Sequence, residues 1–470
     1  MDVPACPGCR ERDARIAALE RRVAELEALV RDLLVRLGTN ASNSGTPPSA
    51  NPPGAPAPVV KKKSGRRRGG QAGHPPHLKQ LLPPERVNAI QTFVPRRCHH
   101  CDAALPARPS AHDPEPSRFQ TIELPPVVAS VTEYQGHART CPSCGQVTRA
   151  AIPRDILVHS VGPRLTATLS YLAGCHGVSK RGVEEIAAVV FDAPVALGTV
   201  ANLEQEMSAA LAAPHAEAVA AVQQAAVKHA DETSWKLAGK LCWLWAAAGA
   251  GVVAFVIHAK RGAAGLAAIL GIEIAGIVCS DRWAVYNQVP AERRQVCWAH
   301  LKRDFQKIVD RGGPSVFVGL EGRKIVHKVF AAWHAFQEGQ TTRRQLQDHL
   351  APVKNRLQRL LLKGAILGED ATVATFCDNL LALEPALWTF VVIEGVEPTN
   401  NLIERLLRRA VLWRKRSFGC VSAAGCRFVE RILTVVQTRR LQGRNALDYL
   451  HDALRAHRAG KPCPQLLPAG

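Results

Sequence analysis

No stretch of this 470-residue sequence is both apolar and long enough to cross a membrane. The longest largely apolar run, residues 241–257, is shorter than the roughly 20 residues that a spanning helix needs. Gly249 and Gly251 interrupt this run where a hairpin would turn, so it predicts two buried strands. The chain also begins without the apolar segment of a secretory signal. We therefore expect a cytoplasmic, nucleoid-associated protein with reduced cysteines and no membrane partner.

Acidic residues are scarce relative to basic ones. Lys and Arg together number 60 and Asp and Glu 40, which gives a formal charge of +20. This excess favours a polyanionic partner such as DNA, RNA or acidic lipid, and a merely soluble basic protein is the alternative. The apolar content of 47% is sufficient for at least one large core.

The first 80 residues combine a helix pattern with a polar linker. Residues 1–38 carry an apolar a/d seam, which predicts a coiled coil and a parallel dimer, or alternatively a single helix packed on its own domain. Residues 39–80 are rich in Pro, Ser and Asn and predict a disordered basic linker. Its basic side chains can bind DNA phosphates without sequence preference, or can remain solvated. The seam is Ile16, Leu19, Val23, Leu26, Val30, Leu33 and Leu37, and the basic residues are Lys61, Lys62, Lys63, Arg66, Arg67 and Arg68.

Two CxxC motifs lie in residues 81–160, Cys98 with Cys101 and Cys141 with Cys144. Paired CxxC turns are typical of tetrahedral structural Zn²⁺, because each turn presents two thiolates to one ion. Alternating apolar residues between Phe119 and Tyr134 predict the strands of a small zinc ribbon. Cys6 and Cys9 form a third CxxC, whose role the sequence leaves open.

Residues 161–222 have the apolar spacing of three amphipathic helices. Thr199 and Asn202 open the last of them, in an arrangement that resembles a helix-turn-helix for DNA. Generic three-helix packing explains the same spacing.

Residues 223–305 alternate between strand and helix patterns, which predicts an α/β sheet. Asp231 follows a short run of small and β-branched residues, and Asp281 follows the apolar strand pattern of residues 274–279. A helix is expected over residues 260–270, another from Arg282, and a further strand over residues 294–298. The sequence thus predicts two carboxylates at strand ends. A single Asp in such a place is also a common turn or cap residue.

Residues 306–395 have a helical period throughout and predict a helical insertion without a chemical motif. Residues 396–450 follow as the second part of the core, and residues 451–470 as a C-terminal tail. Thr399 is the expected N-cap of a helix that carries Glu404 and Arg408 on one face. An ordinary surface pair of Glu404 with Arg408 is the alternative.

Four segments together resemble one family, the insertion-sequence 66 family of DDE transposases. They are HADET at 229–233, SDRWAVYN at 280–287, CWAHLKRDF at 297–305 and EPTNNLIERLLR at 397–408. The resemblance extends to the heptad helix, the linker, the basic stretch and the paired CxxC. It implies a ribonuclease-H-like catalytic core interrupted by a helical insertion. Carried over, the catalytic triad falls on Asp231, Asp281 and Glu404, with Asp231 as the bridging ligand by analogy.

Phosphodiester chemistry explains why three carboxylates are needed. Converging carboxylates can hold two Mg²⁺ or Mn²⁺ ions about 4 Å apart, which activate the nucleophile and stabilise the leaving oxygen. Glu232 would point away from Asp231 on an extended chain and is left out of the triad. His300 is expected to be a core or supporting residue rather than a ligand.

The predicted function is therefore a transposase that binds the terminal inverted repeats of its own element and target DNA as a dimer or larger assembly. Accessory proteins encoded by the element are further candidate partners, and the sequence leaves open whether they are required. A non-catalytic zinc and helix-turn-helix DNA-binding protein from a decayed element is one alternative. A nuclease that cuts without joining is the other. The residues expected to contact DNA near the active site are Asn400, Asn401, Arg405, Arg408, Arg414, Lys415 and Arg416.

Overall fold

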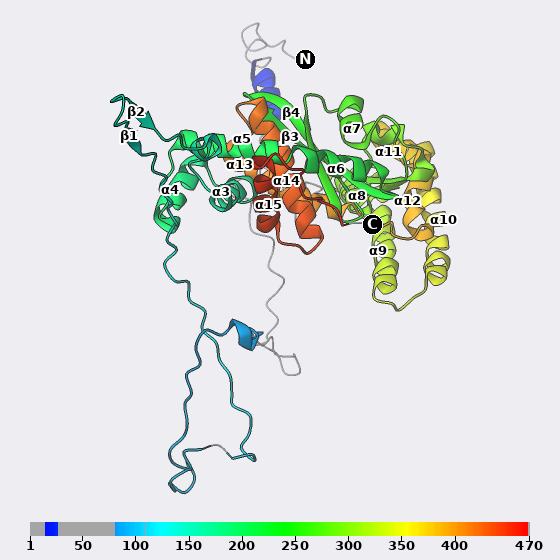
Figure 1. Ribbon diagram of the computed structural model, residues 1–470. Helices are drawn as coiled ribbons and strands as arrows, with labels where there is room; N and C mark the ends of the chain where they lie inside the picture. The colour runs from blue at the N-terminus through cyan, green and yellow to red at the C-terminus, as the bar shows by residue number, and fades with distance from the viewer. Residues whose placement is uncertain (1–14, 27–79, 109, 469–470) are drawn as a thin grey trace, which may run out of the picture. The chain divides into compact units, whose positions relative to one another are not determined.

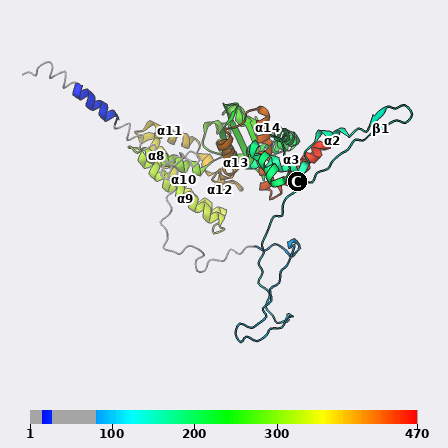
Figure 2. The ribbon, with the colours of Figure 1, turned by 90° about the vertical axis from the view of Figure 1, so that its left-hand side faces the viewer.

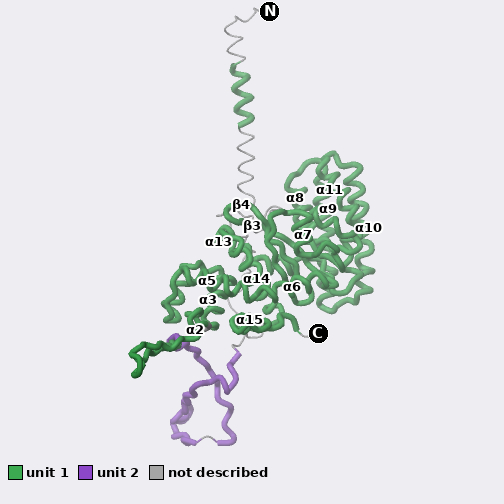
Figure 3. The backbone as a smooth tube through the Cα atoms, turned by 45° about the horizontal axis from the view of Figure 1, so that its top comes forward, with its two compact units in different colours: residues 1–59, 130–470 green, residues 60–129 purple. Residues whose placement is uncertain are grey.

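The computed structural model describes residues 15–26, 80–108 and 110–468, which are coloured in Figure 1. Contacts between residues divide the chain into a small unit, residues 60–129, and a large unit, residues 1–59 and 130–470 (Figure 3). The predictions for the linker, for the basic stretch at 61–68 and for Cys6 and Cys9 lie outside the described residues.

Residues 15–26 are helical, as the heptad pattern predicts. The apolar side chains of the seam in this segment are all exposed, namely Ile16, Leu19, Val23 and Leu26. An exposed apolar seam is what a coiled-coil partner would cover. The coiled coil itself stays a prediction.

The small unit contains little regular structure among its described residues. It has one 3-10 helix, η2 (Pro84–Arg86), and an isolated bridge between Arg97 and Ala104. The strands predicted between Phe119 and Tyr134 are wrong, because residues 119–134 contain no strand. Apolar alternation stabilises a strand only where one face is buried, and Phe119 is 86% exposed.

The large unit continues with a hairpin and a group of helices. Strands β1 (Ala138–Thr140) and β2 (Val147–Arg149) pair antiparallel, and the short helix α2 (Arg154–Val158) follows them. The three amphipathic helices predicted next are confirmed. They are α3 (Pro163–His176), α4 (Lys180–Phe191) and α5 (Leu197–Ala210), which share a small core.

A five-stranded sheet forms the centre of the large unit, in the order β5-β4-β3-β6-β7. Strands β3 (Val227–Leu237), β4 (Lys240–Gly249) and β5 (Val252–His258) form an antiparallel meander, and this confirms the predicted hairpin. Both connections are Ala-Gly pairs with positive φ, 49° and 79° at Ala238 and Gly239 and 51° and 74° at Ala250 and Gly251. Two successive positive φ values give the turn whose twist matches the strands it joins.

Strands β6 (Ile277–Ser280) and β7 (Arg294–Val296) extend the sheet on the other side of β3, and β6 runs parallel to it. The helix predicted over residues 260–270 is shorter, α7 (Ala263–Leu270). The helix predicted from Arg282 is instead a 3-10 turn, η3 (Ala284–Gln288), and a second turn, η4 (Ala291–Arg293), leads into β7. A backbone bond from Trp283 to the Asp281 side chain turns the chain there.

The free edge of β5 is covered by a helix near the C-terminus, α14 (Ala423–Leu441). The hydroxyls of Thr434 and Thr438 accept hydrogen bonds from the backbone N–H groups of Phe255 and Val253, at 3.0 and 3.1 Å. These side chains satisfy donors that an edge strand otherwise leaves unpaired. Helix α6 (Ala212–Gln224) and helix α15 (Ala446–Arg458) share the same core.

The predicted helical insertion is confirmed, and its helices share a second core. Helix α8 (Trp298–Arg311) leads into it from β7, and the insertion helices lie together on the β7 side of the sheet in Figures 1 and 2. They are α9 (Val316–Gln337), α10 (Arg343–Leu367), α11 (Ala371–Ala382) and α12 (Glu384–Val392).

After the insertion, helix α13 (Asn401–Ser417) returns the chain to the sheet. Its N-cap is Asn400 and not Thr399, so the cap prediction is wrong by one residue. None of the helices in the described part of the chain is long and apolar enough to cross a bilayer.

Candidate functional site

The two aspartates predicted at strand ends come from neighbouring parallel strands, β3 and β6, but the prediction is wrong for Asp231, because β3 continues past it to Leu237. Asp231 is in the middle of β3, and Asp281 directly follows β6. The pairing of β3 with β6 ends at His229 opposite Cys279. Asp231 and Asp281 each lie two residues beyond this last pair, in the same register. The sheet therefore brings together two carboxylates that are 50 positions apart in the chain.

The third acid, Glu404, comes from the first turn of α13 and is half-buried. Its electrostatic influence reaches Asp231, whose pKa lies well above the ordinary value. Burial is the largest cause of that rise, followed by the nearby charges of Glu232, Asp281 and Glu404. A buried carboxyl group whose pKa is raised in this way readily takes up a proton or a cation.

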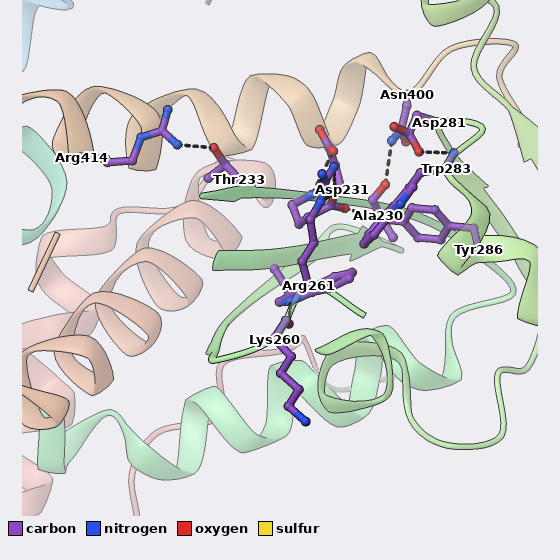
Figure 4. Close-up of polar contacts among 12 residues, drawn as sticks. Ala230, Asp231, Thr233, Lys260, Arg261, Asp281, Trp283, Tyr286, Asn400 and Arg414 are labelled. Atoms are coloured by element: carbon purple, nitrogen blue, oxygen red, sulfur yellow. Dashed lines mark hydrogen bonds and ion pairs between the residues drawn. The ribbon is translucent and has the colours of Figure 1, made fainter. Parts of the chain in front are cut away.

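Asn400 fixes α13 against the sheet at this point. Its side-chain amide donates a 2.8 Å hydrogen bond to the carbonyl of Ala230, and its side-chain oxygen lies 3.0 Å from the His229 ring nitrogen Nδ1 (Figure 4). Its backbone N–H donates to the thiol sulfur of Cys297 at 3.2 Å. The residue before the helix is thus bonded to the residue before Asp231. The DNA contact suggested for Asn400 is wrong, because its side chain is buried and bonded within the protein.

The start of helix α8 meets the start of α13 beside the acids. The backbone N–H of Trp298 donates to the carbonyl of Pro398 at 2.8 Å. His300 Nδ1 then lies 3.5 Å from Glu404 Oε1, and both of these atoms are buried without a hydrogen-bond partner in the described structure. Burial is the main cause that lowers the pKa of His300, which favours its neutral form. His300 thus lies beside Glu404, and its role as a supporting residue stays a prediction.

Glu232 has partners of its own. Its carboxylate accepts hydrogen bonds from the Arg261 guanidinium at 2.8 and 3.0 Å and from the Tyr286 hydroxyl at 3.0 Å. Arg261 in turn lies over the rings of Trp243 and Trp283, 4.7 and 4.2 Å from their centroids. Figure 4 shows Arg261 extending beside Asp231. These contacts support leaving Glu232 out of the triad, since its charge is already matched by a cation.

A cleft of about 650 Å³ opens beside Asp281, which is the one of the three proposed acids that lines it. Asp281 and His300 line it, together with the basic side chains of Arg261, Arg282 and Lys307. Arg282 and Lys307 both pair with Asp304, at 2.6 and 3.1 Å. A cleft that joins carboxylates to cations is suited to hold a phosphate near a metal ion.

The donor set suits a hard divalent cation. The carboxylate oxygens of Asp231, Asp281 and Glu404 are the ligand type that Mg²⁺ and Mn²⁺ prefer. The buried, unpartnered Oε1 of Glu404 is an acceptor that a cation would satisfy. The acids themselves repel one another, as the raised pKa of Asp231 indicates, and a bound cation would relieve that repulsion.

The basic side chains predicted to contact DNA fall into two groups. Asn401, Arg405 and Arg408 are exposed on the helix that carries Glu404. Arg414 is half-buried, and its guanidinium donates to the Thr233 hydroxyl at 2.9 Å and to Ser234 (Figure 4). Lys415 and Arg416 are exposed at the end of the same helix. The contacts of Arg414 favour a structural role, and DNA binding by each of these residues stays a prediction.

The two CxxC motifs belong to different units, Cys98 and Cys101 to the small unit and Cys141 and Cys144 to the large one. In each motif the first cysteine accepts hydrogen bonds from the backbone of its own turn, and this lowers its pKa. A lowered thiol pKa favours the thiolate that zinc binds. The four-cysteine zinc site stays a prediction.

Sequence reasoning did not assign the supporting roles of Asn400, Cys297 and Arg261. Asn400 directly precedes a helix that carries a predicted catalytic residue, and this position gave a usable signal. Cys297 and His300 have the spacing of two residues one turn apart at a helix start. No local pattern in the sequence pointed to Arg261, because its partner Glu232 lies 29 positions away, on strand β3.

Comparison with known proteins places Asp231, Asp281 and Glu404 within one matched region. Residues 159–427 match the model of a family described as Transposase IS66 family, and residues 4–80 match a family of unknown function, DUF6444. The uncharacterized protein y4qI of Sinorhizobium fredii is similar to this chain, with 25% identity over 250 residues. That alignment covers 48% of this chain and 45% of the relative, so the chain spans about half the length of the protein it matches.

Proposed function

Because this chain belongs to the IS66 transposase family, we propose that it binds the terminal inverted repeats of a mobile element and performs metal-dependent DNA strand cleavage and strand transfer. The family gives the chain a transposase role. The proposal adds the chemistry, which it assigns to Asp231, Asp281 and Glu404 as a DDE triad.

One observation supports this chemistry above the others. Asp231 and Asp281 lie on adjacent parallel strands, and the charges of Asp281 and Glu404 both reach Asp231 and raise its pKa. The charges of Asp281 and Glu404, which are distant from Asp231 in the sequence, thus both act on the buried carboxyl group of Asp231. A structural role for such a cluster is hard to justify, because mutual repulsion and burial both cost stability.

Two Mg²⁺ or Mn²⁺ ions bound by these carboxylates would activate the attacking water or 3′-hydroxyl and stabilise the leaving oxygen. The protein's part is to hold the three acids at fixed positions. Asn400 connects the helix of Glu404 to the strand of Asp231, and the Trp298 backbone connects it to α8. Positions fixed in this way before DNA arrives reduce the entropy that the reaction must lose.

The strand order β5-β4-β3-β6-β7, with an antiparallel meander followed by parallel strands, supports a ribonuclease-H-like core. The chain leaves this core after α8 and returns at α13, where Glu404 lies. The helical insertion therefore separates the second proposed acid from the third in sequence, and the proposal requires the core to bring them together. This arrangement agrees with the resemblance described for the sequence.

DNA would approach along the face that carries the cleft and α13. Arg405 and Arg408 are exposed one turn apart on this helix, and Lys307 lines the cleft with 59% of its side chain exposed. Lysine and arginine in such places neutralise phosphates and give affinity that falls with salt. Further DNA contacts would come from three predicted regions: the zinc-binding CxxC motifs, the helix-turn-helix over α3–α5 and the basic stretch at 61–68. A dimer or larger assembly would hold two element ends.

The test uses purified full-length protein, a labelled duplex that carries the element end taken from DNA flanking the gene, and a target plasmid. Asp231→Asn, Asp281→Asn and Glu404→Gln should each lower Mg²⁺-dependent cleavage by about a thousandfold or more. Glu394→Gln, an exposed acid at the end of α12, is the matched control and should cleave as the parent does. Normal cleavage by all three triad variants would remove the assignment.

The products separate the two alternative functions. Cleavage without a joined donor–target product would favour a nuclease of the same fold. DNA binding without cleavage under any divalent metal would favour a non-catalytic DNA-binding protein. The proposal expects joined products, and their appearance without any added protein would mean that accessory proteins are dispensable for the chemistry.

A further inference from the structure

Three different donor atoms converge beside the acidic cluster, the sulfur of Cys297, a ring nitrogen of His300 and a carboxylate oxygen of Glu404. We propose that they form a binding site for Zn²⁺ or a similar transition-metal cation. Because the site shares Glu404 with the proposed triad, zinc bound there would compete with the catalytic metals and inhibit the transposase. The inhibition rests on the proposed function, but the metal site does not.

The geometry is compact. The possible ligand atoms of Cys297, His300 and Glu404 all lie within 4.8 Å of one another, and they form the one such group of three among the described residues. His300 Nδ1 and Glu404 Oε1 are 3.5 Å apart. Tetrahedral zinc with bonds of about 2.0 to 2.3 Å requires ligands separated by about 3.5 Å, so small side-chain movements would complete the site.

The backbone explains why these residues meet. Cys297 is the N-cap of α8 and His300 lies one turn on, while Glu404 is in the first turn of α13. The two helix starts are held together by the Trp298 bond to Pro398 and by the Asn400 bond to the Cys297 sulfur. The three donors are therefore presented by two rigid helix ends and not by a loop.

Two of the three donor atoms make no hydrogen bond in the described structure. His300 Nδ1 and Glu404 Oε1 are both buried without a hydrogen-bond partner, although they face each other. Buried polar atoms without partners destabilise a fold, and a metal ion is one of the groups that can satisfy them. This pair therefore provides an observation independent of the distances.

The chemistry of the donors selects the ion. A thiol, an imidazole and a carboxylate together match the ligands of zinc, whereas Mg²⁺ prefers oxygen alone. Zinc binding would displace the thiol proton of Cys297 to solvent, and the resulting thiolate would keep the hydrogen bond from the Asn400 backbone. Three protein ligands leave the fourth position free, and His300 lines the cleft next to Asp281.

The binding test compares full-length protein with two single variants, after chelator treatment and removal of the chelator. Zinc alone is titrated and the bound equivalents per chain are counted by calorimetry and elemental analysis. Cys297→Ser should bind one equivalent fewer than the parent. Cys377→Ser is the matched control, because Cys377 is equally buried but lies in the insertion helix α11. The zinc predicted at the CxxC motifs is common to all three proteins and cancels in the comparison.

His300→Asn provides a second variant in case the serine substitution perturbs folding, and it should lose the same equivalent. Cobalt as a probe gives a further readout, since a bond to thiolate adds a charge-transfer absorption that Cys297→Ser should lower and Cys377→Ser should not. Equal zinc equivalents and equal cobalt spectra in all four proteins would overturn the site.

The inhibition is tested with Mg²⁺-dependent cleavage of the element end. The inhibition of each protein is expressed relative to its own zinc-free rate. Zinc should inhibit the parent and Cys377→Ser at similar concentrations, whereas Cys297→Ser should need at least about tenfold more zinc to reach the same fractional inhibition. Inhibition of Cys297→Ser at the parental concentration would overturn the competition for Glu404. If none of the proteins cleaves DNA, the proposed function fails while the zinc titration still decides the metal site.

Discussion

The side-chain amide of Asn400 donates a 2.8 Å hydrogen bond to the backbone carbonyl of Ala230, the residue that precedes Asp231. The contact joins residues 170 positions apart. It connects the helix that carries Glu404 with the strand that carries Asp231. A single buried amide therefore helps to hold the helix of one proposed catalytic acid against the strand of another.

Replacement of Asn400 by Ala should harm both stability and activity. It removes the bonds to Ala230 and His229 and leaves the Ala230 carbonyl buried without this partner, at a cost of about 1 to 3 kcal/mol in the free energy of unfolding. Cleavage should fall by about tenfold or more in protein that is still folded, because the acids lose their fixed separation. Denaturant unfolding and cleavage rates measure the two effects. Asn401→Ala, an exposed neighbour, should leave the unfolding free energy within about 0.5 kcal/mol of the parent.

Asp231 should make the metal-free protein less stable as the pH rises. Burial and the nearby carboxylates raise its pKa in the folded state, so the folded chain binds more protons than the unfolded chain between the two pKa values. Stability is then highest below the unfolded pKa and falls as the pH rises through the folded one. Asp231→Asn should lose less stability than the parent between about pH 5 and pH 8 in the presence of chelator.

Thermal unfolding at several pH values measures this difference. Glu394→Gln removes one exposed carboxylate and should keep the parental pH dependence. Identical pH dependence of stability in Asp231→Asn and the parent would show that burial and the nearby carboxylates do not raise the pKa of Asp231 in the folded protein. Added Mg²⁺ should raise the unfolding temperature of the parent more than that of Asp231→Asn, since only the folded state offers the full set of ligands.

The local patterns of the sequence pointed to Asp231 and Asp281 as candidate site residues. Asp231 and Asp281 follow apolar strand patterns, and the Ala-Gly turn after residue 249 separates two buried runs. These features depend on neighbours a few positions away, so the sequence shows them directly. The helix spacing also singled out Glu404, but it left an ordinary surface pair with Arg408 as the alternative, and the resemblance to the family gave Glu404 its catalytic role.

Long-range contacts account for what the sequence did not predict. Asn400 looks like a surface polar residue until the sheet places Ala230 beside it. Arg414 has the pattern of a basic patch but its guanidinium is bonded to Thr233 and Ser234. The apolar alternation from Phe119 suggested strands, yet the described chain gives it no partner to bury it. For Asn400 and Arg414 the partner is far away in sequence, where periodicity carries no information.

Gly322 should be one of the least replaceable residues of the insertion. A methyl group at this position would lie 2.2 Å from the ring of Phe305 in α8, the helix that also carries His300. Because both helices are packed, Gly322→Ala should cost about 1 to 3 kcal/mol of stability through forced separation of α8 from α9. Gly198→Ala, near the start of α5 where a methyl group meets nothing within 4 Å, should be neutral or stabilising. Equal unfolding free energies for the two variants would contradict the close helix contact.

Arg408 and Arg414 lie on the same helix. Replacement of Arg408 should affect DNA binding, whereas replacement of Arg414 should affect stability. Arg408 is exposed, so Arg408→Ala should keep the unfolding free energy and weaken binding to any DNA duplex, with a slope of log affinity against log salt reduced by about one. Arg414→Ala should instead lower stability, by about 1 to 3 kcal/mol, because the Thr233 hydroxyl and the Ser234 carbonyl lose a charged donor. Its salt slope should remain parental. Filter binding over a range of salt concentrations, together with denaturant unfolding, separates the two roles. A reduced salt slope in Arg414→Ala would show that this guanidinium leaves Ser234 to contact phosphate when DNA is bound.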